Sequence, residues 1–415
     1  MNALSPKADV ESSAARPWLA IVGVGEDGRA GLSPAALRAL ETATLVVGGA
    51  RHLALVAPIA APTLAWPSPI ADGYGAILAR RGEAVCVLAT GDPFNHGVGA
   101  ELARLIPADE IVCHPGPSAF TLAAARMGWS LPECACVSLH GRALERIIPL
   151  LQPGARLLAL SWDGTTPARL AALLDERGMG GSKLTVLEAM GGPRERVRTA
   201  DAAGFALGDV DPLNTIALQV EAPLTARVVT LAPGLDDAWF ANDGQLTKSE
   251  MRAMTLAALA PRAGELLWDV GAGAGSVAIE WCLSHPRNRC LAIEERAERA
   301  ERARGNALQL GAVGVEVRVG QAPGALADLP PPDAVFIGGG AHEAGVFEAC
   351  WGALKPGGRL VINAVTLETE ARLAALHGAY GGLMRRIALS RLERVGSMHG
   401  WRAAMPVTQW LVTKP

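Results

Sequence analysis

Three alternating glycines near the middle of the chain form a loop that could hold a nucleoside. The segment LLWDVGAGAGS at 266–276 is an apolar run that ends in glycine, which predicts a buried strand followed by a tight turn. Glycine gives the backbone conformations that other residues resist, and it lets a ligand approach closely. Gly271, Gly273 and Gly275 are spaced G-x-G-x-G, and Ser276 stands where the dinucleotide fingerprint needs its last glycine. The spacing therefore disfavours NAD.

Two acidic residues flank this loop at positions that suit a nucleoside. Glu294 lies roughly 20 residues beyond the glycines, where a second parallel strand would place a carboxylate against ribose hydroxyls. Asp269 immediately precedes the loop and can bind its backbone amides or a cationic ligand group. The alternative for the loop alone is a glycine-rich turn in a chain that is rich in alanine and glycine. With both acids included, the pattern resembles the class I S-adenosylmethionine-dependent methyltransferases.

The elements that would position this loop continue toward the C-terminus. PPDAVFIGGG at 331–340 predicts a strand that opens into a glycine turn, and LKPGGRLVINAV at 354–365 predicts a turn and another strand. Between them, residues 296–310 have alanine, leucine and charged residues at helical spacing. Alternating strands and helices favour an α/β fold with a doubly wound, mainly parallel sheet, whose ligands lie at the carboxyl ends of the strands.

Length and charge limit the remaining possibilities. With 415 residues, the chain is expected to form two domains, each large enough for its own core. The net charge of −3 provides no general basic field for nucleic acid. No apolar stretch reaches the roughly 20 residues that a membrane helix needs, and residues 1–17 lack the apolar core of a signal peptide. We therefore expect a cytoplasmic enzyme that binds neither nucleic acid nor membrane.

Cysteine spacing bears on metal binding, and the composition of two segments indicates where the domains begin and end. None of the seven cysteines forms C-x-x-C, and Cys134 and Cys136 are the only close pair, which favours reduced structural cysteines and no metal site. Residues 1–17 have no periodicity and predict a flexible tail. APGLDDAWFANDGQ at 232–245 combines proline, glycine and acids between two patterned regions. We therefore expect one domain at 18–232 and a second at 233–415.

The first half has a glycine loop of its own. PWLAIVGVGEDG at 17–28 is an apolar strand whose three glycines satisfy G-x-G-x-x-G. However, Glu26 and Asp27 lie inside the loop and would repel a pyrophosphate, and the helix is expected to start later, with Ser33 as its cap. The second strand, ATLVVGG at 43–49, ends without a ribose-binding carboxylate. NAD is disfavoured here as well.

Five segments of the first half resemble a known superfamily. AVCVLATGDPFNHGVG at 84–99 predicts a strand ending in a turn, PGPSAFTLAAARMGW at 115–129 a turn before a helix, and LEAMGGPRERV at 187–197 a strand leading to a charged helix. In this order they resemble the tetrapyrrole methylase superfamily, also called class III methyltransferases. VVGGARHL at 46–53 and SLHGR at 138–142 resemble the branch that acts on carbon 5 of precorrins.

The second half resembles the decarboxylating precorrin methyltransferases that act on carbon 15. The segments that carry this likeness are QLTKSEMRA at 245–253, DVGAGAGSVAIEW at 269–281, GQAPGALADLPPPDAVFIGGG at 320–340 and GGRLVINAVTLET at 357–369. One departure is Gln321, because that family often has an acidic residue there. Over nearly all of residues 18–413, the fusion resembles the bifunctional precorrin methyltransferases of the aerobic cobalamin pathway.

The resemblance implies a fold, a reaction and two cofactors. It implies a tetrapyrrole methylase domain followed by a Rossmann-like class I methyltransferase domain, each binding one S-adenosylmethionine. The first half would methylate precorrin-6Y at carbon 5, and the second would methylate carbon 15 and remove the ring C acetate carboxylate, giving precorrin-8X. Alternatives are methylation of another tetrapyrrole and a non-catalytic sensor of S-adenosylmethionine. We expect a homo-oligomer whose partner is a small-molecule tetrapyrrole substrate.

The resemblance also implies site residues. Those expected at the first cofactor are Gly23, Gly25, Gly91, Asp92, Pro93, Ser118, Ala119 and Met190. Those expected at the second are Thr247, Gly271, Ala272, Gly273, Ala274, Gly275, Glu294 and Ala322. Candidates for substrate carboxylates are His96, His140, Arg142, Lys248 and Arg252, with solvated loops or helix faces as the alternative. Lys248 and Arg252 are four residues apart on an expected helix and would share a face.

Methyl transfer and decarboxylation require few catalytic side chains. Methyl transfer from a sulfonium is an in-line displacement, so the protein positions the nucleophilic carbon and excludes water, and no catalytic nucleophile is required. Decarboxylation needs an electron sink, which protonation of a macrocycle carbon would supply. His342, just after IGGGA, is our candidate proton donor because it should lie at the carboxyl end of a strand and face the site. The alternative is an exposed loop histidine.

Overall fold

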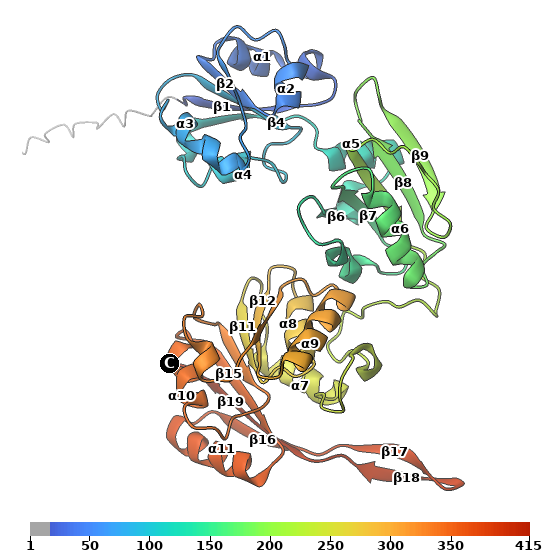
Figure 1. Ribbon diagram of the computed structural model, residues 1–415, viewed down its shortest axis with the longest axis vertical. Coiled ribbons are helices and arrows are strands. Elements are labelled where there is room, and N and C mark those ends of the chain that lie inside the picture. The colour runs from blue at the N-terminus through green and yellow to red at the C-terminus, as the bar shows by residue number, and fades with distance from the viewer. Residues whose placement is uncertain (1–16) are drawn as a thin grey trace, which may run out of the picture. The chain divides into compact units, whose positions relative to one another are not determined.

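The computed structural model describes residues 17–415, which form two compact units (Figure 1). The first unit contains the described residues up to 142 together with 153–227, and the second contains 143–152 and 228–415. The expected tail at 1–17 lies, apart from Pro17, outside the described residues. Within the described range, no helix is long and apolar enough to cross a membrane.

A five-stranded parallel sheet opens the first unit, in the order β3-β2-β4-β1-β5. Its strands and helices are β1 (Leu19–Val24), α1 (Pro34–Glu41), β2 (Leu45–Gly48), α2 (Ala50–Leu55), β3 (Thr63–Ala65), α3 (Tyr74–Leu78), β4 (Val85–Thr90), α4 (Gly99–Leu102) and β5 (Ile111–His114). Side chains alternate along β1, so Ile21 packs into one apolar cluster and Val22 into another. Ser33 caps α1 as predicted, because its hydroxyl accepts from the amide of Ala36 at 3.2 Å.

A mixed sheet completes the first unit, in the order β6-β7-β10-β8-β9. Its elements are α5 (Ala119–Met127), β6 (Cys134–Ser138), β7 (Arg156–Leu160), α6 (Thr166–Glu176), β8 (Lys183–Glu188), β9 (Arg196–Asp201) and β10 (Asn214–Gln219). The charged helix expected within 187–197 is wrong, because residues 189–195 form an irregular turn that joins β8 to the antiparallel strand β9. Arg196 and Arg198, two residues apart on one side of β9, both donate to the fully buried carboxylate of Glu188.

A seven-stranded sheet organises the second unit, in the order β13-β12-β11-β14-β15-β19-β16. The five strands β11 to β15 pair in parallel, and β19 is antiparallel to both of its neighbours. The elements are α7 (Ser249–Leu259), β11 (Leu266–Val270), α8 (Ser276–Leu283), β12 (Arg289–Glu294), α9 (Ala297–Leu310), β13 (Val315–Val319), β14 (Ala334–Ile337), α10 (Val346–Ala353), β15 (Arg359–Ala364), α11 (Leu367–Tyr380), β16 (Leu383–Ile387) and β19 (Val407–Thr413). The predicted doubly wound, mainly parallel sheet is confirmed.

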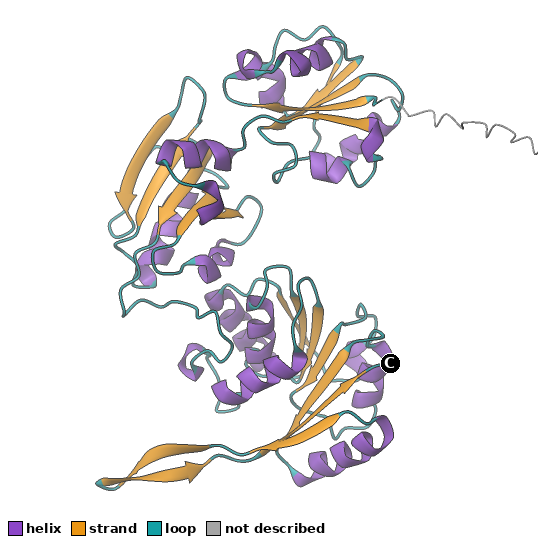
Figure 2. Cartoon of the chain, turned by 180° about the vertical axis from the view of Figure 1, so that it is seen from behind, coloured by secondary structure: helices purple, strands orange, loops and turns teal. Residues whose placement is uncertain are grey.

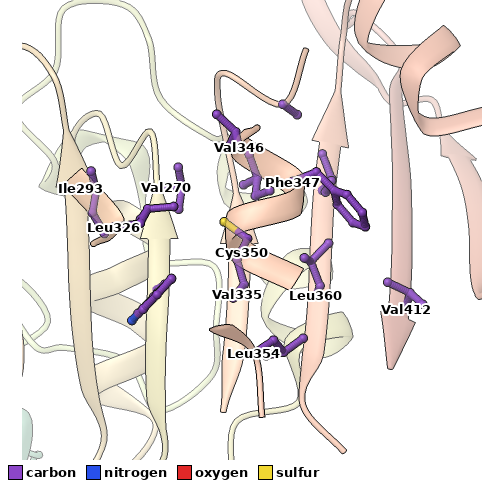
Figure 3. Close-up of a cluster of buried hydrophobic side chains, with 14 of the residues drawn as sticks. Val270, Ile293, Leu326, Val335, Val346, Phe347, Cys350, Leu354, Leu360 and Val412 are labelled. Atoms are coloured by element: carbon purple, nitrogen blue, oxygen red, sulfur yellow. The ribbon is translucent and has the colours of Figure 1, made fainter. Parts of the chain in front are cut away.

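Helix α10 covers one face of this sheet with apolar side chains (Figure 3). Phe347 and Cys350 on α10 are buried against Val335 of β14 and Leu360 of β15. The Phe347 ring lies with its centroid 5.8 Å from that of Trp410. Burying an aromatic side chain of this size stabilises the fold by roughly 2–3 kcal/mol, so this cluster holds the carboxyl ends of β14 and β15 in place.

A two-stranded hairpin extends from the sheet of the second unit (Figure 2). It consists of β17 (Ser390–Val395) and β18 (Met398–Ala403), which pair with each other. The described residues also form the 3₁₀ helices η1 (Gly28–Gly31), η2 (Ile70–Gly73), η3 (Ala108–Glu110), η4 (Leu131–Glu133), η5 (Leu144–Leu150), η6 (Asp237–Trp239) and η7 (Gly324–Leu326). All seven cysteines lie in the described part of the chain and are free thiols.

Candidate functional site

A cavity of about 870 Å³ lies at the carboxyl ends of the parallel strands of the second unit. Its wall includes the glycine loop after β11, the end of β12 and the glycine turn after β14. Of the residues expected at the second cofactor, those that line the cavity are Thr247, Gly271, Ala272, Gly273, Ala274, Glu294 and Ala322. This is the position at which open α/β sheets bind their ligands.

The loop after β11 needs glycine for two separate reasons. Gly271 and Gly273 have φ angles of +73° and +57°, in the left-handed region that other residues rarely adopt. A Cβ on Gly271 would also lie 2.9 Å from the backbone nitrogen of Gly339, so the two loops approach too closely for a side chain. Gly275 does not line the cavity; it caps α8, and a Cβ there would meet Ala303 of α9 at 3.0 Å. Its role is therefore structural.

Asp269 and Glu294 give the cavity two buried carboxylates with different partners. Glu294 accepts from the backbone amides of Gly273 at 2.8 Å and Arg296 at 3.1 Å. Asp269 accepts from the amide of Ala278 at 3.0 Å through Oδ2, while its buried Oδ1 has no partner in the structure. Burial, with a smaller contribution from the charge of Glu294, raises the pKa of Asp269 to about 7. Oδ1 is therefore left with its full capacity to accept a hydrogen bond.

These features fit S-adenosylmethionine. The unpartnered Oδ1 of Asp269 can accept from the cationic amino group of the cofactor, since both atoms would be charged and desolvated. The carboxylate of Glu294 retains acceptor capacity for ribose hydroxyls beyond the two backbone amides that it binds. Gly273 has open space where a side chain would stand, its nearest neighbour being the carbonyl oxygen of Gln245 at 3.9 Å.

The substrate role expected for Arg252 is wrong. Its guanidinium is fully buried, donates to Glu280 and to the carbonyl oxygens of Leu235 and Thr247, and does not line the cavity. It therefore has no surface to offer a ligand. Glu280 also accepts from the amides of Gly234 and Leu235, so this ion pair anchors the segment before α7 and places Thr247 at the cavity.

Lys248 lines the cavity but does not share a helix face with Arg252. It is the N-cap residue of α7, with extended backbone angles of φ −62° and ψ 152°, and the helix begins at Ser249. Its ammonium lies 3.4 Å from the carboxylate of Asp237. The expected pairing of the two cations on one helical face is thus corrected, while Lys248 keeps access to a ligand.

His342 does not face the cavity, contrary to expectation. It lies on the turn between β14 and α10, its side chain is exposed, and it is not among the residues that line the cavity wall. Its neighbour Glu343 does line the wall, and Gln321 donates to that carboxylate at 3.4 Å. The exposed-loop alternative therefore describes His342 better than a role as proton donor.

The first unit has a smaller cavity, of about 60 Å³, between the ends of its two sheets. Of the residues expected there, Gly25, Gly91, Ala119 and Met190 line it. Gly23 lies outside the wall and is needed for packing, since a Cβ would stand 1.7 Å from the carbonyl oxygen of Gly91. The expected site is thus partly assembled around the loop after β1.

The other residues expected near the first cavity support its loops or lie on the surface. The carboxylate of Asp92 accepts from the amide of Phe94 at 2.9 Å, which makes it a turn former, and Pro93 is buried beside it. Ser118 is buried and caps α5 by accepting from the amide of Thr121 at 3.1 Å. The side chains of His96, His140 and Arg142 are exposed, and none lines the small cavity.

Sequence reasoning missed functional candidates in both units. In the first cavity, Glu26 forms an ion pair with Arg51, and both line the wall. In the second, Asn363 and Arg391 line the wall from the end of β15 and from the hairpin. The only local signal was Glu26 inside its glycine loop; the others are single polar residues in apolar or charged segments. Within residues 17–415, no group of His, Cys, Asp and Glu could hold a metal ion.

Comparisons with known proteins agree with this architecture. Residues 19–206 match the model of the Tetrapyrrole (Corrin/Porphyrin) Methylases, and residues 238–414 match that of the precorrin methyltransferase domain. A precorrin-6Y C(5,15)-methyltransferase (decarboxylating) of Sinorhizobium sp is 52% identical over 97% of this chain and 98% of its own length. The protein of the same name from Mycobacterium tuberculosis is 43% identical, over 95% and 99%. The crystal structure of the C-terminal domain of the Rhodobacter capsulatus precorrin-6Y C5,15-methyltransferase is 49% identical and covers 45% of this chain and 100% of that domain, with a TM-score of 0.43.

Both matched models describe methyltransferases, and the glycine loop, Asp269 and Glu294 line one cavity of the second unit. The chain is therefore an S-adenosylmethionine-dependent methyltransferase that joins a tetrapyrrole methylase fold to a Rossmann-like fold. Its curated relatives align over nearly their whole length. The chain belongs to the family of precorrin-6Y C5,15-methyltransferases (decarboxylating).

Proposed function

We propose that this chain methylates precorrin-6Y at carbons 5 and 15 and removes the carboxylate of the ring C acetate, giving precorrin-8X in cobalamin biosynthesis. The observation that carries the proposal is the 870 Å³ cavity of the second unit, in which the buried Oδ1 of Asp269 lacks a partner. A cavity of this size suits a cofactor with part of a large substrate. Full-length similarity to enzymes of this name supports the reaction.

The two halves divide the work between them. We assign carbon 5 methylation to residues 18–232, and carbon 15 methylation with decarboxylation to residues 233–415. Each half would bind one S-adenosylmethionine, since each has a glycine loop that lines a cavity at the ends of its strands. Homo-oligomerisation and a cytoplasmic location stay predictions.

In the second unit, the residues on the cavity wall have distinct proposed roles. Asp269 accepts from the amino group of the cofactor, and Glu294 accepts from its ribose hydroxyls. Gly271, Ala272, Gly273 and Ala274 give backbone close to its methionine portion, with Thr247 and Ala322 at further contacts. Lys248 attracts a substrate carboxylate.

In the first unit, the proposed cofactor contacts are Gly25, Gly91, Ala119 and Met190. Gly23, Asp92, Pro93 and Ser118 act indirectly, by holding the loops that carry these contacts. We place no substrate contact on His96, His140 or Arg142, because none of the three lines the small cavity.

The cofactor supplies a methyl group on a sulfonium, which the nucleophilic substrate carbon takes by in-line displacement. The residues of this chain orient the two reactants and exclude water, and most of the rate enhancement from such a site comes from this positioning. For decarboxylation, the buried apolar part of the wall, which includes Val270, Val277 and Val346, would keep the substrate in a poorly solvated space.

The division of labour is tested by blocking one loop at a time in the full chain. Gly273→Val places a side chain where Gly273 now leaves open space. Gly25→Val adds a side chain on the wall of the first cavity, where its Cβ would meet Oδ1 of Asp27 at 2.5 Å and force that side chain to move. Each variant and the wild type receive precorrin-6Y and S-adenosylmethionine, and mass spectrometry counts methyl gain and carbon dioxide loss. The wild type should show two methyl gains and one loss of carbon dioxide.

The Gly273→Val chain should gain a single methyl group and lose no carbon dioxide. Release of carbon dioxide by that variant at the wild-type rate would contradict the assignment of decarboxylation to the second half. In the Gly25→Val chain, any product that loses carbon dioxide after only one methyl gain supports the assignment. A wild-type chain that leaves precorrin-6Y unchanged would refute the proposed function itself.

A further inference from the structure

A chain of polar side chains runs beneath the cavity of the second unit. The Nε of Arg385 donates to Oε1 of Gln409 at 3.0 Å, and Nε2 of Gln409 donates to Oδ1 of Asn363 at 2.9 Å. Nδ2 of Asn363 then donates to the hydroxyl of Thr255 at 2.9 Å, and that hydroxyl donates to the carbonyl oxygen of Met251 at 2.7 Å. Gln409 and Thr255 are buried, so water does not compete for these bonds.

The direction of this chain is fixed at its start. A guanidinium only donates, so the atom of Gln409 that faces Arg385 must be its carbonyl oxygen. The amide nitrogen of Gln409 therefore faces Asn363, which in turn must present its own oxygen to Gln409. It follows that the NH₂ group of Asn363 faces Thr255 with one hydrogen and has a second hydrogen to offer.

The second hydrogen is available to a ligand. Asn363 lies near the end of β15 and lines the cavity wall, while its other neighbours in the chain of hydrogen bonds are buried. In the sheet, β12 and β15 lie on opposite sides of β11, with β14 between β11 and β15. The loop after β11 and Glu294 of β12 make up the proposed cofactor side. Asn363 thus belongs to the side left for the substrate.

We propose that Asn363 is a substrate-positioning residue that donates an N–H hydrogen bond to a carboxylate oxygen of the tetrapyrrole in the second unit. This inference rests on the proposed function, which makes the substrate a polycarboxylate. The fixed amide suits an acceptor and not a donor, because its oxygen is already engaged with Gln409. A neutral amide also orients a carboxylate without cancelling its charge.

The geometry makes a specific order of substitutions testable. Asn363→Ala removes the donor, and Asn363→Asp keeps the shape and the bond from Gln409 while presenting a negative charge to the cavity. Hydrogen bonds to charged groups contribute roughly 1.5–3 kcal/mol, so Asn363→Ala should raise KM for carbon dioxide release from precorrin-6Y by about tenfold or more. Asn363→Asp should raise KM further, because like charges repel.

Two measurements separate this role from a structural one. Calorimetry should give the same affinity for S-adenosylmethionine in the wild type and in both variants, since Asn363 lies on the substrate side. The matched control is Asn288→Asp, which changes a buried asparagine that holds the amide of Gly264 and does not line the cavity. It should lower Tm without raising KM.

The possible outcomes decide the matter. The proposal is supported if KM rises from the wild type to Asn363→Ala and again to Asn363→Asp. It is overturned if KM of Asn363→Asp is at or below that of the wild type. If Asn363→Asp fails to fold, Asn363→Ala carries the test, and an unchanged KM there also overturns the proposal. A wild-type chain that releases no carbon dioxide from precorrin-6Y contradicts the proposed function instead, so the two failures are distinguishable.

Discussion

The carboxylates of Asp269 and Glu294 come from adjacent parallel strands, β11 and β12, and line the same cavity. Glu294 is held by two backbone amides, whereas Asp269 has one oxygen without a partner. Burial and the neighbouring charge raise the pKa of Asp269 to about 7. Before a ligand binds, Asp269 is therefore about half protonated at neutral pH, and a cationic group would draw it into the charged form.

This raised pKa predicts a pH-dependent stability. Because the pKa of Asp269 is higher in the folded chain than its ordinary value of 3.8, the folded state binds more protons between about pH 4 and pH 7. Its contribution to the free energy of unfolding is then full below pH 4 and falls as pH rises to about 7, by roughly 4 kcal/mol in all. Asp269→Asn should remove this part of the slope. Urea unfolding of both chains at pH 5 and pH 8 measures it, and parallel pH profiles would contradict it.

The same carboxylate predicts how pH affects the cofactor. If Asp269 binds the amino group of S-adenosylmethionine, the carboxylate must lose its proton first, so affinity falls as pH drops below about 7. The limit is about tenfold per pH unit. Calorimetry from pH 5.5 to about 8 should show this decline in the wild type and not in Asp269→Asn. If affinity depends on pH equally in the wild type and in Asp269→Asn, the amino group of the cofactor does not bind Asp269. Cofactor binding by the first unit is the same in both proteins and does not affect this comparison.

Gly271 is predicted to tolerate no side chain. Gly271→Ala combines a left-handed backbone, which costs roughly 1–2 kcal/mol for other residues, with a Cβ 2.9 Å from the backbone of Gly339. We expect carbon dioxide release to fall at least about tenfold, since both loops that line the cavity must shift. Gly305→Ala is the control, because Gly305 lies inside α9 with nothing near its added Cβ. It should raise the free energy of unfolding by roughly 0.5–1 kcal/mol without loss of activity.

Arg252 is predicted to matter for stability. Arg252→Met leaves the carboxylate of Glu280 buried without its cation, and removing one partner of a buried pair typically costs about 3–5 kcal/mol. Arg402→Gln breaks the exposed pair with Glu393 and should cost at most about 1 kcal/mol. Chemical unfolding of the two variants compares them directly. Similar losses in the free energy of unfolding would mean that the buried Arg252–Glu280 pair does not stabilise the segment before α7.

The Arg252 case shows which parts of the site were open to prediction from sequence. The loop at 271–275 and Glu294 follow from local pattern, since an apolar run ending in glycine and a carboxylate one strand later need no distant contact. Whether Arg252 is buried depends on Glu280 of α8 and Asp237, neither of which is near it in sequence. Its helical spacing from Lys248 indicated a shared face, but the helix begins one residue after Lys248.

The expectations for residues 194–198 and His342, and the omission of Asn363, also reflect structure that the local sequence pattern does not show. The charged stretch at 194–198 has helical composition, yet the buried Glu188 on β8 pairs with two arginines that only an extended strand presents on one side. His342 follows a strand end, as a catalytic residue often does, but it lies on the turn before α10 with its side chain exposed. Asn363 is a single polar residue in an apolar run, so the local sequence did not indicate a role for it. Its amide is oriented by Gln409 and Arg385, which are distant in sequence.

Lys248 is predicted to contribute to substrate binding. It lines the cavity, and its side chain is 52% exposed and paired with Asp237 at 3.4 Å, so a substrate carboxylate can replace that partner. Exposed charge pairs are worth about 0.2–1 kcal/mol, so Lys248→Gln should raise KM for carbon dioxide release by roughly two- to fivefold at low salt, with kcat nearly unchanged. The matched control is Lys355→Gln: that ammonium is similarly exposed and pairs with Asp333 at 2.7 Å, but it does not line the cavity. The effect of Lys248→Gln should fade as ionic strength rises. Equal KM values for the two variants would remove Lys248 from the substrate site.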